Sequence, residues 1–157
     1  MKRLVIKVGT AVLTQDGQLA LERMDNLVNL ISKLKNEKNL QVILVSSGAV
    51  GAGFTSLKLD KKIVANKQAL AAIGQPLLLK HYKKRFKQHN IVCAQMLFIA
   101  DDFDSRKRSK NAQNVMEILL DNNILPIINE NDVIATEELV FGDNDQLAAH
   151  VAYYFKA

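Results

Sequence analysis

Two short polar segments near the C-terminal end of the chain carry most of its candidate chemistry. Residues 129–132 directly follow an apolar run, and residues 142–145 lead into a helix-like segment. One Asp or Asn is enough to cap a helix and one turn residue is enough to end a strand, so these carboxylates and amides exceed what folding needs. The surplus predicts a site for a small polar ligand. The side chains concerned are Asn129, Glu130, Asn131, Asp132, Asp143, Asn144 and Asp145.

Lys7 is the candidate cation, because it interrupts the apolar run of residues 4–8. A lysine inside a strand that is covered on both faces is costly unless its charge is matched. Either Lys7 lies near the end of the strand and extends its ammonium to water, or the ammonium meets an anion there. Gly9 and Thr10 follow immediately, so backbone N–H groups can approach the same anion.

A turn rich in glycine and serine, at residues 46–53, follows a second apolar run at residues 41–45. A strand that enters such a turn and then a helix is typical of backbone amides aimed at an anion. The turn has neither the P-loop pattern nor the Gly-x-Gly-x-x-Gly pattern. Close packing of a strand against a helix would also require small residues, and it explains Gly51 and Gly53 better than it explains residues 46–49.

Apolar patterns predict the elements that must position these residues. We expect strands at residues 3–8, 41–45, 91–99 and 124–128, and helices at residues 22–38, 63–89, 111–120 and 144–156. Residues 74–76 (Gly-Gln-Pro) predict a break or kink in the second helix. Asp101 and Asp102 could cap the helix that follows them, and Asp143 could simply begin the last one, where the helix dipole favours acids.

The alternation of strands and helices predicts the α/β class, with a parallel open sheet and helices on both faces. Right-handed crossovers place the loops after the strands along one edge of the sheet. That edge would gather residues 7–10, 46–53 and 129–132, and ligands bind at such edges in open α/β sheets. Polar motifs at successive strand ends are a stronger signal than any one motif alone.

The composition limits the class of protein. With 157 residues, 48% hydrophobic and 24% charged, one globular domain with a real core is expected. No apolar run approaches the roughly 20 residues of a membrane span, and the N-terminus lacks the pattern of a secretory signal. A cytoplasmic location follows, with the single Cys93 as a buried small hydrophobe. The spacing of His81, His89 and His150 predicts no metal site.

The net charge of +5 comes largely from two basic clusters, at residues 80–87 and 106–110. Either cluster could attract nucleic acid, which would give a steeply salt-dependent affinity. A solvated helix face is the simpler explanation, because charge runs usually have that role and no nucleic-acid motif accompanies these. We therefore expect neither a nucleic-acid partner nor a membrane partner.

Taken together, these motifs resemble the amino-acid kinase family along the whole chain. The matching segments are residues 7–10, 46–53, 120–132 and 142–145. Within the family, the chain resembles the members that transfer the γ-phosphoryl group of ATP to the side-chain carboxylate of L-glutamate, in the first step of proline biosynthesis. The segments at 128–132 and 142–145 are those that distinguish these members from their relatives.

The resemblance implies roles for individual residues. The residues implied to bind the ATP phosphates are Lys7, Gly9 and Thr10. The residues implied to bind the substrate are Ser47, Gly48, Ala49, Asn129, Asp132 and Asn144. The residues implied in catalysis are Lys7, which would contact the transferring phosphoryl group, and Asp145, which would orient the phosphate-binding lysines.

ATP and Mg²⁺ are the implied cofactors, with a homo-oligomer and feedback inhibition by proline at the glutamate site. The chemistry agrees, because phosphoryl transfer depends mainly on positioning and charge stabilisation. A carboxylate nucleophile is already ionised at neutral pH, so it needs no general base. Lys7 could offset the negative charge that develops on the phosphoryl oxygens, and Asp132 could pair with the ammonium of glutamate.

Family members continue beyond the equivalent of residue 157, with the adenine pocket and a second phosphate-binding lysine. The resemblance therefore identifies residues 1–157 as the N-terminal, glutamate-side part of the kinase domain, without its nucleotide-binding remainder. We expect this part alone to bind nucleotide poorly and to turn over little substrate.

Two alternatives to glutamate phosphorylation stay open. One is another amino-acid kinase, acting on acetylglutamate, aspartate, carbamate or a nucleoside monophosphate. The other is a non-catalytic module that binds an amino acid or a partner.

Overall fold

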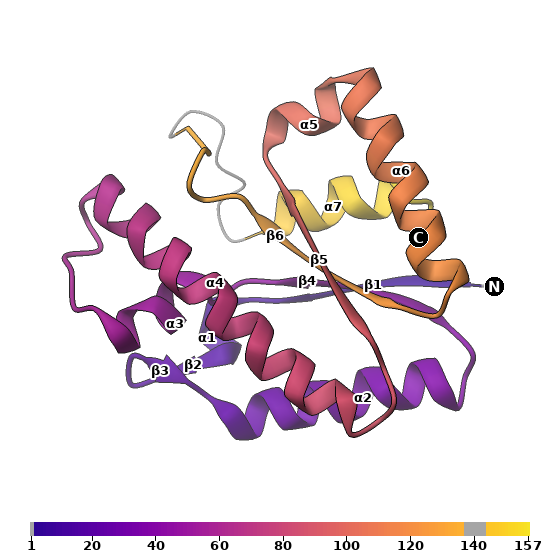
Figure 1. The fold of residues 1–157 in the computed structure, drawn as a ribbon, viewed down its shortest axis with the longest axis horizontal. Helices are drawn as coiled ribbons and strands as arrows, with labels where there is room; N and C mark the ends of the chain where they lie inside the picture. Colours follow the sequence, from indigo (N-terminus) through magenta and orange to yellow (C-terminus); the bar gives the residue numbers. More distant parts are fainter. Residues whose placement is uncertain (1, 137–143) are drawn as a thin grey trace.

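A parallel sheet forms the centre of the computed structural model, which describes residues 2–136 and 144–157. Within the described residues, the sheet has the order β1-β4-β6-β5, and each neighbouring pair is parallel. Figure 1 shows these strands between two layers of helices. The predicted fold class is confirmed. The strands are β1 (Arg3–Val8), β4 (Gln41–Ser46), β5 (Cys93–Phe98) and β6 (Leu125–Glu130).

Helices cover both faces of the sheet. α2 and α4 lie on one face, and α5, α6 and α7 lie on the other (Figure 1). The helices are α1 (Thr10–Leu13), α2 (Leu21–Asn36), α3 (Ala49–Ser56), α4 (Val64–Lys87), α5 (Ala100–Asp104), α6 (Arg106–Asp121) and α7 (Asp145–Tyr154). In the part of the chain that the structure describes, no helix combines the length and hydrophobicity needed to span a membrane.

The apolar side chains of the central strands divide between two cores. In β4, Val42 and Leu44 join the core under α2 and α4, whereas Ile43 and Val45 join the core under α6 and α7. Every residue of β4 and β6 is buried. Strands covered on both faces are expected to be continuously apolar, which is why both were recognisable in the sequence.

Helix α4 runs unbroken from Val64 to Lys87 with Pro76 inside it. Of the predicted break or kink at residues 74–76, the break is therefore wrong. The carbonyl that Pro76 leaves unbonded belongs to Ala72, which is exposed, so water can hydrate it.

Gly74 allows α4 to pack closely against α3. A Cβ on Gly74 would overlap the Ala49 carbonyl oxygen, and a Cβ on Gly53 would overlap that of Leu70. Helices α3 and α4 therefore cross backbone to backbone.

A hairpin that the sequence analysis missed follows α1. Its strands are β2 (Thr14–Gln15) and β3 (Gln18–Leu19), paired antiparallel. The two turn residues, Asp16 and Gly17, have positive φ angles of 52° and 74°. An Asp-Gly pair favours this turn because both positions require φ above zero. The dipeptide was therefore an available signal.

Helix α6 begins at Arg106, earlier than the predicted residue 111. Its first turns are basic rather than apolar, so they lack the periodicity that marks a helix. Ser105 caps α6 by accepting a hydrogen bond from the Arg108 N–H at 3.3 Å. Asp102 instead caps α5, because its carboxylate accepts from the Ile99 N–H at 2.8 Å.

Cys93 is half-buried at the start of β5, and not fully buried as predicted. It packs against the core under α2 and α4, and this partial burial raises the pKa of its thiol to about 12. The strand β5 lies at the edge of the described sheet, which leaves one side of the residue open. The thiol is therefore protonated at neutral pH, as expected of a small hydrophobe.

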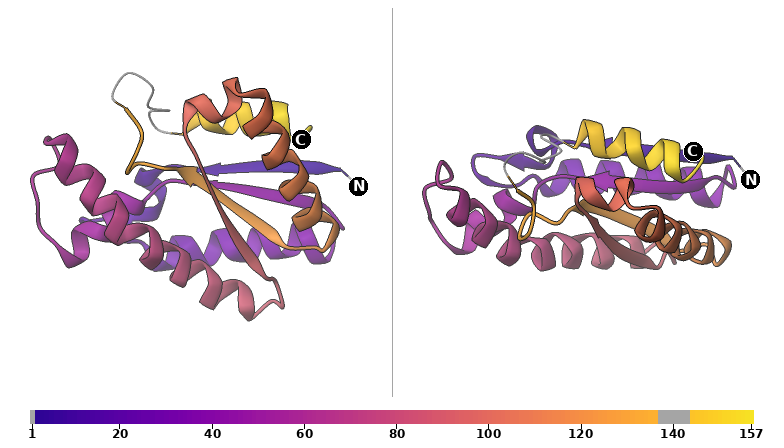
Figure 2. Two further views of the ribbon diagram at one scale, coloured as in Figure 1. Left: turned by 45° about the horizontal axis from the view of Figure 1, so that its top comes forward. Right: turned by 90° about the horizontal axis from the view of Figure 1, so that it is seen from above.

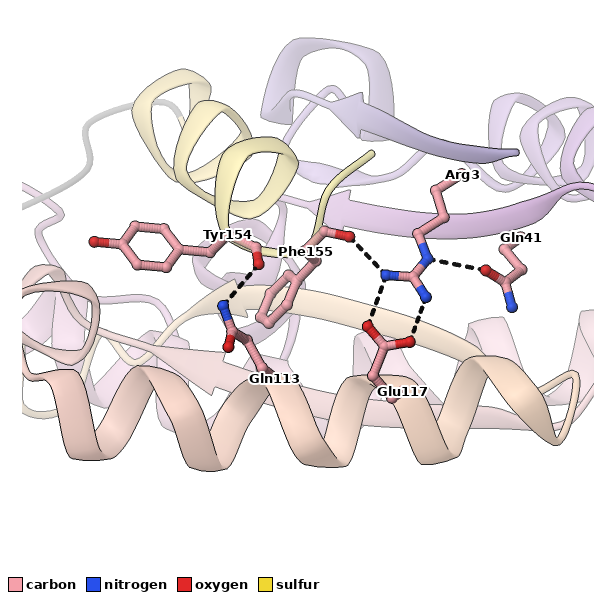
Figure 3. Close-up of polar contacts among 6 residues, drawn as sticks. All are labelled: Arg3, Gln41, Gln113, Glu117, Tyr154 and Phe155. Atoms are coloured by element: carbon pink, nitrogen blue, oxygen red, sulfur yellow. Dashed lines mark hydrogen bonds and ion pairs between the residues drawn. The ribbon is translucent and has the colours of Figure 1, made fainter. Parts of the chain in front are cut away.

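Arg3 joins four elements at the amino ends of the strands (Figure 3). Its guanidinium donates to Glu117 of α6, to Gln41 Oε1 of β4 at 2.9 Å, and to the Phe155 carbonyl after α7 at 2.9 Å. The hydrogen bonds from Arg3 lower the pKa of Glu117. We call Arg3, Gln41, Glu117 and Phe155 the Arg3 clamp. Because of it, the two ends of the described chain lie close together (Figure 2).

Candidate active site

A pocket of about 260 Å³ lies at the carboxyl ends of the strands. It is lined by residues that follow β1, β4 and β6, by the hairpin, and by the start of α7. The predicted edge of the sheet is therefore where the motifs meet. The predicted site residues that line the pocket are Thr10, Ser47, Gly48, Ala49, Asn129, Asp132 and Asn144.

Buried amides form one wall of the pocket. Asn144 Nδ2 donates to Ser47 Oγ at 2.9 Å and to Asn129 Oδ1 at 2.8 Å. Asn129 Nδ2 donates in turn to Gln75 Oε1 at 2.9 Å. Asn129 and Asn144 are each only 4% exposed, so these hydrogen bonds replace the water that both amides lost on folding. We call Ser47, Gln75, Asn129 and Asn144 the amide network.

Asn144 connects the amide network to α7. It has a φ of 71°, in the left-handed region that asparagine tolerates better than most residues, and α7 begins with the next residue. Asp145 is therefore the first residue of α7. Gly142 and Asp143, which complete this sequence motif, lie outside the described residues.

Lys7 and Asp145 form an ion pair beside the pocket. Lys7 Nζ lies 2.7 Å from Asp145 Oδ1, and the Lys7 side chain is 23% exposed. The ammonium thus meets a carboxylate of the protein itself at the end of β1. That it also meets the anion of a ligand stays a prediction. Gly9 lies beside the ammonium, since a Cβ at Gly9 would stand 3.4 Å from Nζ, an ordinary contact distance. These three residues do not themselves line the pocket, but Asp145 directly follows Asn144, which does.

Asp132 lines the pocket two residues after the end of β6. Its partial burial raises the pKa of its carboxyl group, and the positive charge of Lys67 opposes that rise. A carboxylate that has lost part of its hydration gains from a cationic partner. Lys67 is exposed, and it also lines the pocket.

The first turn of α3 presents backbone to the pocket. Gly48 precedes the helix with a φ of 105°, a conformation that glycine adopts without strain. Ala49, Val50 and Gly51 line the pocket, and N–H groups in a first helical turn have no partner within the helix. The Ser47 N–H is different, since it donates to the Val8 carbonyl at 3.0 Å. This turn suits a carboxylate or phosphate group.

Close packing, one of the two explanations offered for the glycine-rich turn, is confirmed for two of its glycines. Gly53 is needed for the crossing of α3 and α4, and a Cβ at Gly51 would come within 2.7 Å of Thr14 Cγ2. Close packing therefore accounts for these two glycines. Ser47 and Gly48, which precede them, line the pocket, as Gly51 also does.

Several pocket residues were not predicted. Thr14 and Gly17 belong to the hairpin, and the Asp-Gly signal would have placed them. Lys61 also lines the pocket, and it stands in a loop without a recognisable motif. Glu130 lines the pocket as well, and it belongs to the polar segment that the sequence singled out, although no role was predicted for it. The contact between Gln75 and Asn129 was not predicted either. Gln75 does not line the pocket, and it lies in the middle of α4, 54 residues from Asn129. No periodicity or spacing marks that contact.

A magnesium cage made by the protein alone is not found in the described ranges. Among residues 2–136 and 144–157, no group of three or more His, Cys, Asp or Glu side chains could hold a metal ion. Mg²⁺ that arrives with a nucleotide needs only one or two carboxylates, because the phosphates supply the other ligands. The acidic residues at the pocket are compatible with that mode of binding.

Known proteins provide an independent comparison. Residues 2–157 match the amino acid kinase family. The chain is 55% identical over its whole length to a glutamate 5-kinase of Wolinella succinogenes, 61% of which it covers, and 52% identical to one of Leishmania donovani, 59% of which it covers. It is 48% identical to a glutamate 5-kinase of Thermus thermophilus, and it covers 42% of that protein. The chain thus spans about half the length of these curated relatives. Because the family match extends over nearly the whole chain, this protein belongs to the amino acid kinase family.

Proposed function

We propose that the full-length protein transfers the γ-phosphoryl group of ATP to the side-chain carboxylate of L-glutamate. The product would be glutamyl 5-phosphate, the first intermediate of proline biosynthesis. The observation that carries this proposal is the Lys7–Asp145 ion pair beside a pocket lined by Asp132 and by three members of the amide network, Ser47, Asn129 and Asn144. Relatives named glutamate 5-kinase, at 48–55% identity, support the choice of substrate.

The pocket offers a complementary group for each charge of the substrate. Asp132 would pair with the ammonium, since its burial leaves the carboxylate in need of a cation. The first turn of α3 and the amide network would donate hydrogen bonds to a carboxylate. The side-chain carboxylate would then lie toward Lys7. A substrate that lacks the ammonium should bind poorly.

Lys7 would stabilise the transferring phosphoryl group. An oxygen of the glutamate carboxylate attacks the γ-phosphorus, the bond to the β-phosphate oxygen breaks, and ADP leaves. Negative charge on the phosphoryl oxygens is offset by the Lys7 ammonium, which Asp145 holds in place at 2.7 Å. Gly9 and Thr10 would bring backbone N–H groups to the same phosphate. Mg²⁺, when bound with ATP, would neutralise the phosphates further.

The proposal extends to the organisation of the protein. Residues 1–157 would supply the glutamate side of the kinase domain, and the adenine contacts would come from other residues of the full-length protein. The fraction of each relative that the chain covers, 42–61%, supports this division. A cytoplasmic location, a homo-oligomer and inhibition by proline at the glutamate site complete the proposal.

A trapping assay tests the proposed activity. Acyl phosphates react with hydroxylamine, so the full-length protein with ATP, Mg²⁺, L-glutamate and hydroxylamine should form glutamyl hydroxamate. Aspartate, acetylglutamate, carbamate and a nucleoside monophosphate should give much less ATP consumption. A clear preference for one of these over free glutamate would overturn the choice of substrate.

A non-catalytic amino-acid-binding module is the second candidate. It is favoured because the pocket lies within the described residues, although the chain covers only part of each relative. Calorimetric titration of residues 1–157 with L-glutamate, proline and ATP separates the two candidates when it is combined with the trapping assay. Amino-acid binding together with a full-length protein that forms no hydroxamate would support the module.

A further inference from the structure

Gln75 stands behind the wall of the pocket rather than in it. It belongs to α4, and it is not among the residues that line the pocket. Its side chain nevertheless reaches β6, where Gln75 Oε1 accepts a hydrogen bond from Asn129 Nδ2 at 2.9 Å. The adjacent Gly74 brings α4 this close, because its lack of a side chain lets α4 touch the backbone of α3.

One obligate donor fixes the orientation of the Asn129 amide. The backbone N–H of Glu130 donates to Asn129 Oδ1 at 2.8 Å, and a backbone N–H can only donate. The Oδ1 atom must therefore face Glu130, which leaves Asn129 Nδ2 facing Gln75. An acceptor is required at that position, and Gln75 supplies it.

The orientation of the neighbouring amide, that of Asn144, is constrained in the same way. Because Asn129 Oδ1 is an acceptor, Asn144 must present Nδ2 to it, as observed at 2.8 Å. Asn144 Nδ2 also donates to Ser47 Oγ. A reversed Asn129 amide would set its donor against the Glu130 N–H and against Asn144 Nδ2. Each such buried group without a partner would destabilise that arrangement.

We propose that Gln75 is a positioning residue for the amino-acid substrate. By accepting from Asn129 Nδ2, it holds the amide network in the one orientation that gives the pocket a fixed set of donors and acceptors. This proposal rests on the proposed function for its kinetic readout. It acts through Asn129 and Asn144, since Gln75 itself does not line the pocket.

Two near-isosteric variants separate positioning from packing. Gln75→Met keeps the length of the side chain but removes the acceptor, and Gln75→Glu keeps an acceptor at the same place. In the full-length protein, Gln75→Met should raise KM for L-glutamate about tenfold, which is the effect of one unpaired buried group. KM for ATP should change less than about threefold, and Gln75→Glu should restore most of the affinity for glutamate.

Gln113→Met is the matched control. Gln113 Nε2 donates to the Tyr154 carbonyl at 3.0 Å (Figure 3), so this variant also removes one glutamine hydrogen bond, but between α6 and α7, on the face of the sheet opposite α4. Its KM for L-glutamate should equal that of the unmodified protein. If Gln75→Met does not fold, Gln75→Asn, which withdraws the acceptor by one methylene, takes its place.

A second readout is independent of activity. The Asn129 side-chain amide protons should exchange slowly with solvent in the unmodified protein and in Gln75→Glu, and faster in Gln75→Met, as followed by nuclear magnetic resonance. If the protein does not phosphorylate glutamate, the proposed function fails, and this signal still tests Gln75. Equal exchange in all three proteins, or an equal rise in KM for Met and Glu at residue 75, would overturn the proposal.

Discussion

The two ends of the sheet hold α7 in place by different chemistry. At the amino ends of the strands, the Arg3 clamp uses full charges, and the Glu117 side chain is 48% exposed (Figure 3). At the carboxyl ends, the partly exposed Lys7–Asp145 ion pair is joined by the amide network, whose neutral Asn129 and Asn144 are 4% exposed. Among these contacts to α7, each ion pair has at least one partner that water reaches, whereas the amides lie where water does not, because burying an ion is costly.

The difference has a consequence for function. A guanidinium has five donors and tolerates small shifts of its partners, so the Arg3 clamp suits a purely structural role. An amide has a donor end and an acceptor end, so each member of the amide network works in one orientation only. We therefore expect damage at the amino end to lower stability, and damage at the carboxyl end to lower substrate affinity or turnover.

The largest effect is expected at Lys7. Lys7→Met removes the ammonium that would offset charge on the transferring phosphoryl group. In the full-length protein, kcat should fall about 100- to 1,000-fold, as for the loss of other transition-state donors. KM for L-glutamate should change far less. A kcat that stays within threefold of the unmodified protein would remove Lys7 from the proposed mechanism.

Asp132→Asn should act mainly on binding. Loss of a carboxylate that pairs with the substrate ammonium should raise KM for L-glutamate about 100-fold, whereas kcat at saturation should fall much less. Steady-state kinetics with varied glutamate measure this. An unchanged KM would show that the ammonium is bound elsewhere.

The same substitution makes a prediction about stability. Burial raises the pKa of Asp132 above its ordinary value of 3.8, so the folded state favours the protonated form. Stability from this group is therefore greatest below about pH 4 and is lost as pH rises through the folded-state pKa. Asp132→Asn should gain stability relative to the unmodified protein as pH rises from 4 to 7. Thermal unfolding of the ligand-free proteins at both pH values provides the check.

Arg3→Met should lower the stability of the protein and leave its affinity for L-glutamate nearly unchanged. It leaves Gln41 Oε1 and the Phe155 carbonyl without their donor, which should cost about 1–3 kcal/mol in free energy of unfolding. Urea denaturation measures that loss. KM for L-glutamate should stay within about threefold at a temperature where the variant is folded. A rise in KM comparable to that of Gln75→Met would show that the two ends are coupled through α7.

Glu117→Gln should have the smallest effect, and it should depend on pH. The hydrogen bonds from Arg3 lower the pKa of Glu117 below its ordinary value of 4.5. Its contribution is present above pH 4.5 and is lost as pH falls through the folded-state pKa. The difference in unfolding temperature between Glu117→Gln and the unmodified protein should therefore shrink between pH 6 and pH 3. A difference that is constant over this range would contradict the charge-based account of the clamp.

The strands and their order could be predicted from the sequence better than the side-chain contacts could. β4 and β6 were recognisable because buried parallel strands are continuously apolar. Their parallel order then placed residues 46–53 and 129–132 at one edge of the sheet. The location of the pocket could therefore be predicted from the sequence. The basic start of α6 was missed because it lacks an apolar period.

The side-chain hydrogen bonds and ion pairs around the pocket could not be predicted from hydrophobic patterns and strand order. Sequence topology brings Lys7 and Asp145 to the same edge, but only packing decides that they touch at 2.7 Å. Gln75 was read as part of a helix break, because Pro76 dominates the local pattern. Its contact with Asn129 depends on the crossing of α3 and α4, which two glycines permit and which no spacing encodes.

The most direct test of the account is a titration of the full-length protein with L-glutamate, followed through backbone amide chemical shifts. We expect Ser47, Asn129, Asp132 and Asn144 to shift with one common dissociation constant, while the residues of the Arg3 clamp do not move. Shifts that avoid these four residues, or that gather at the amino ends of the strands, would contradict the proposal that the pocket is the glutamate site.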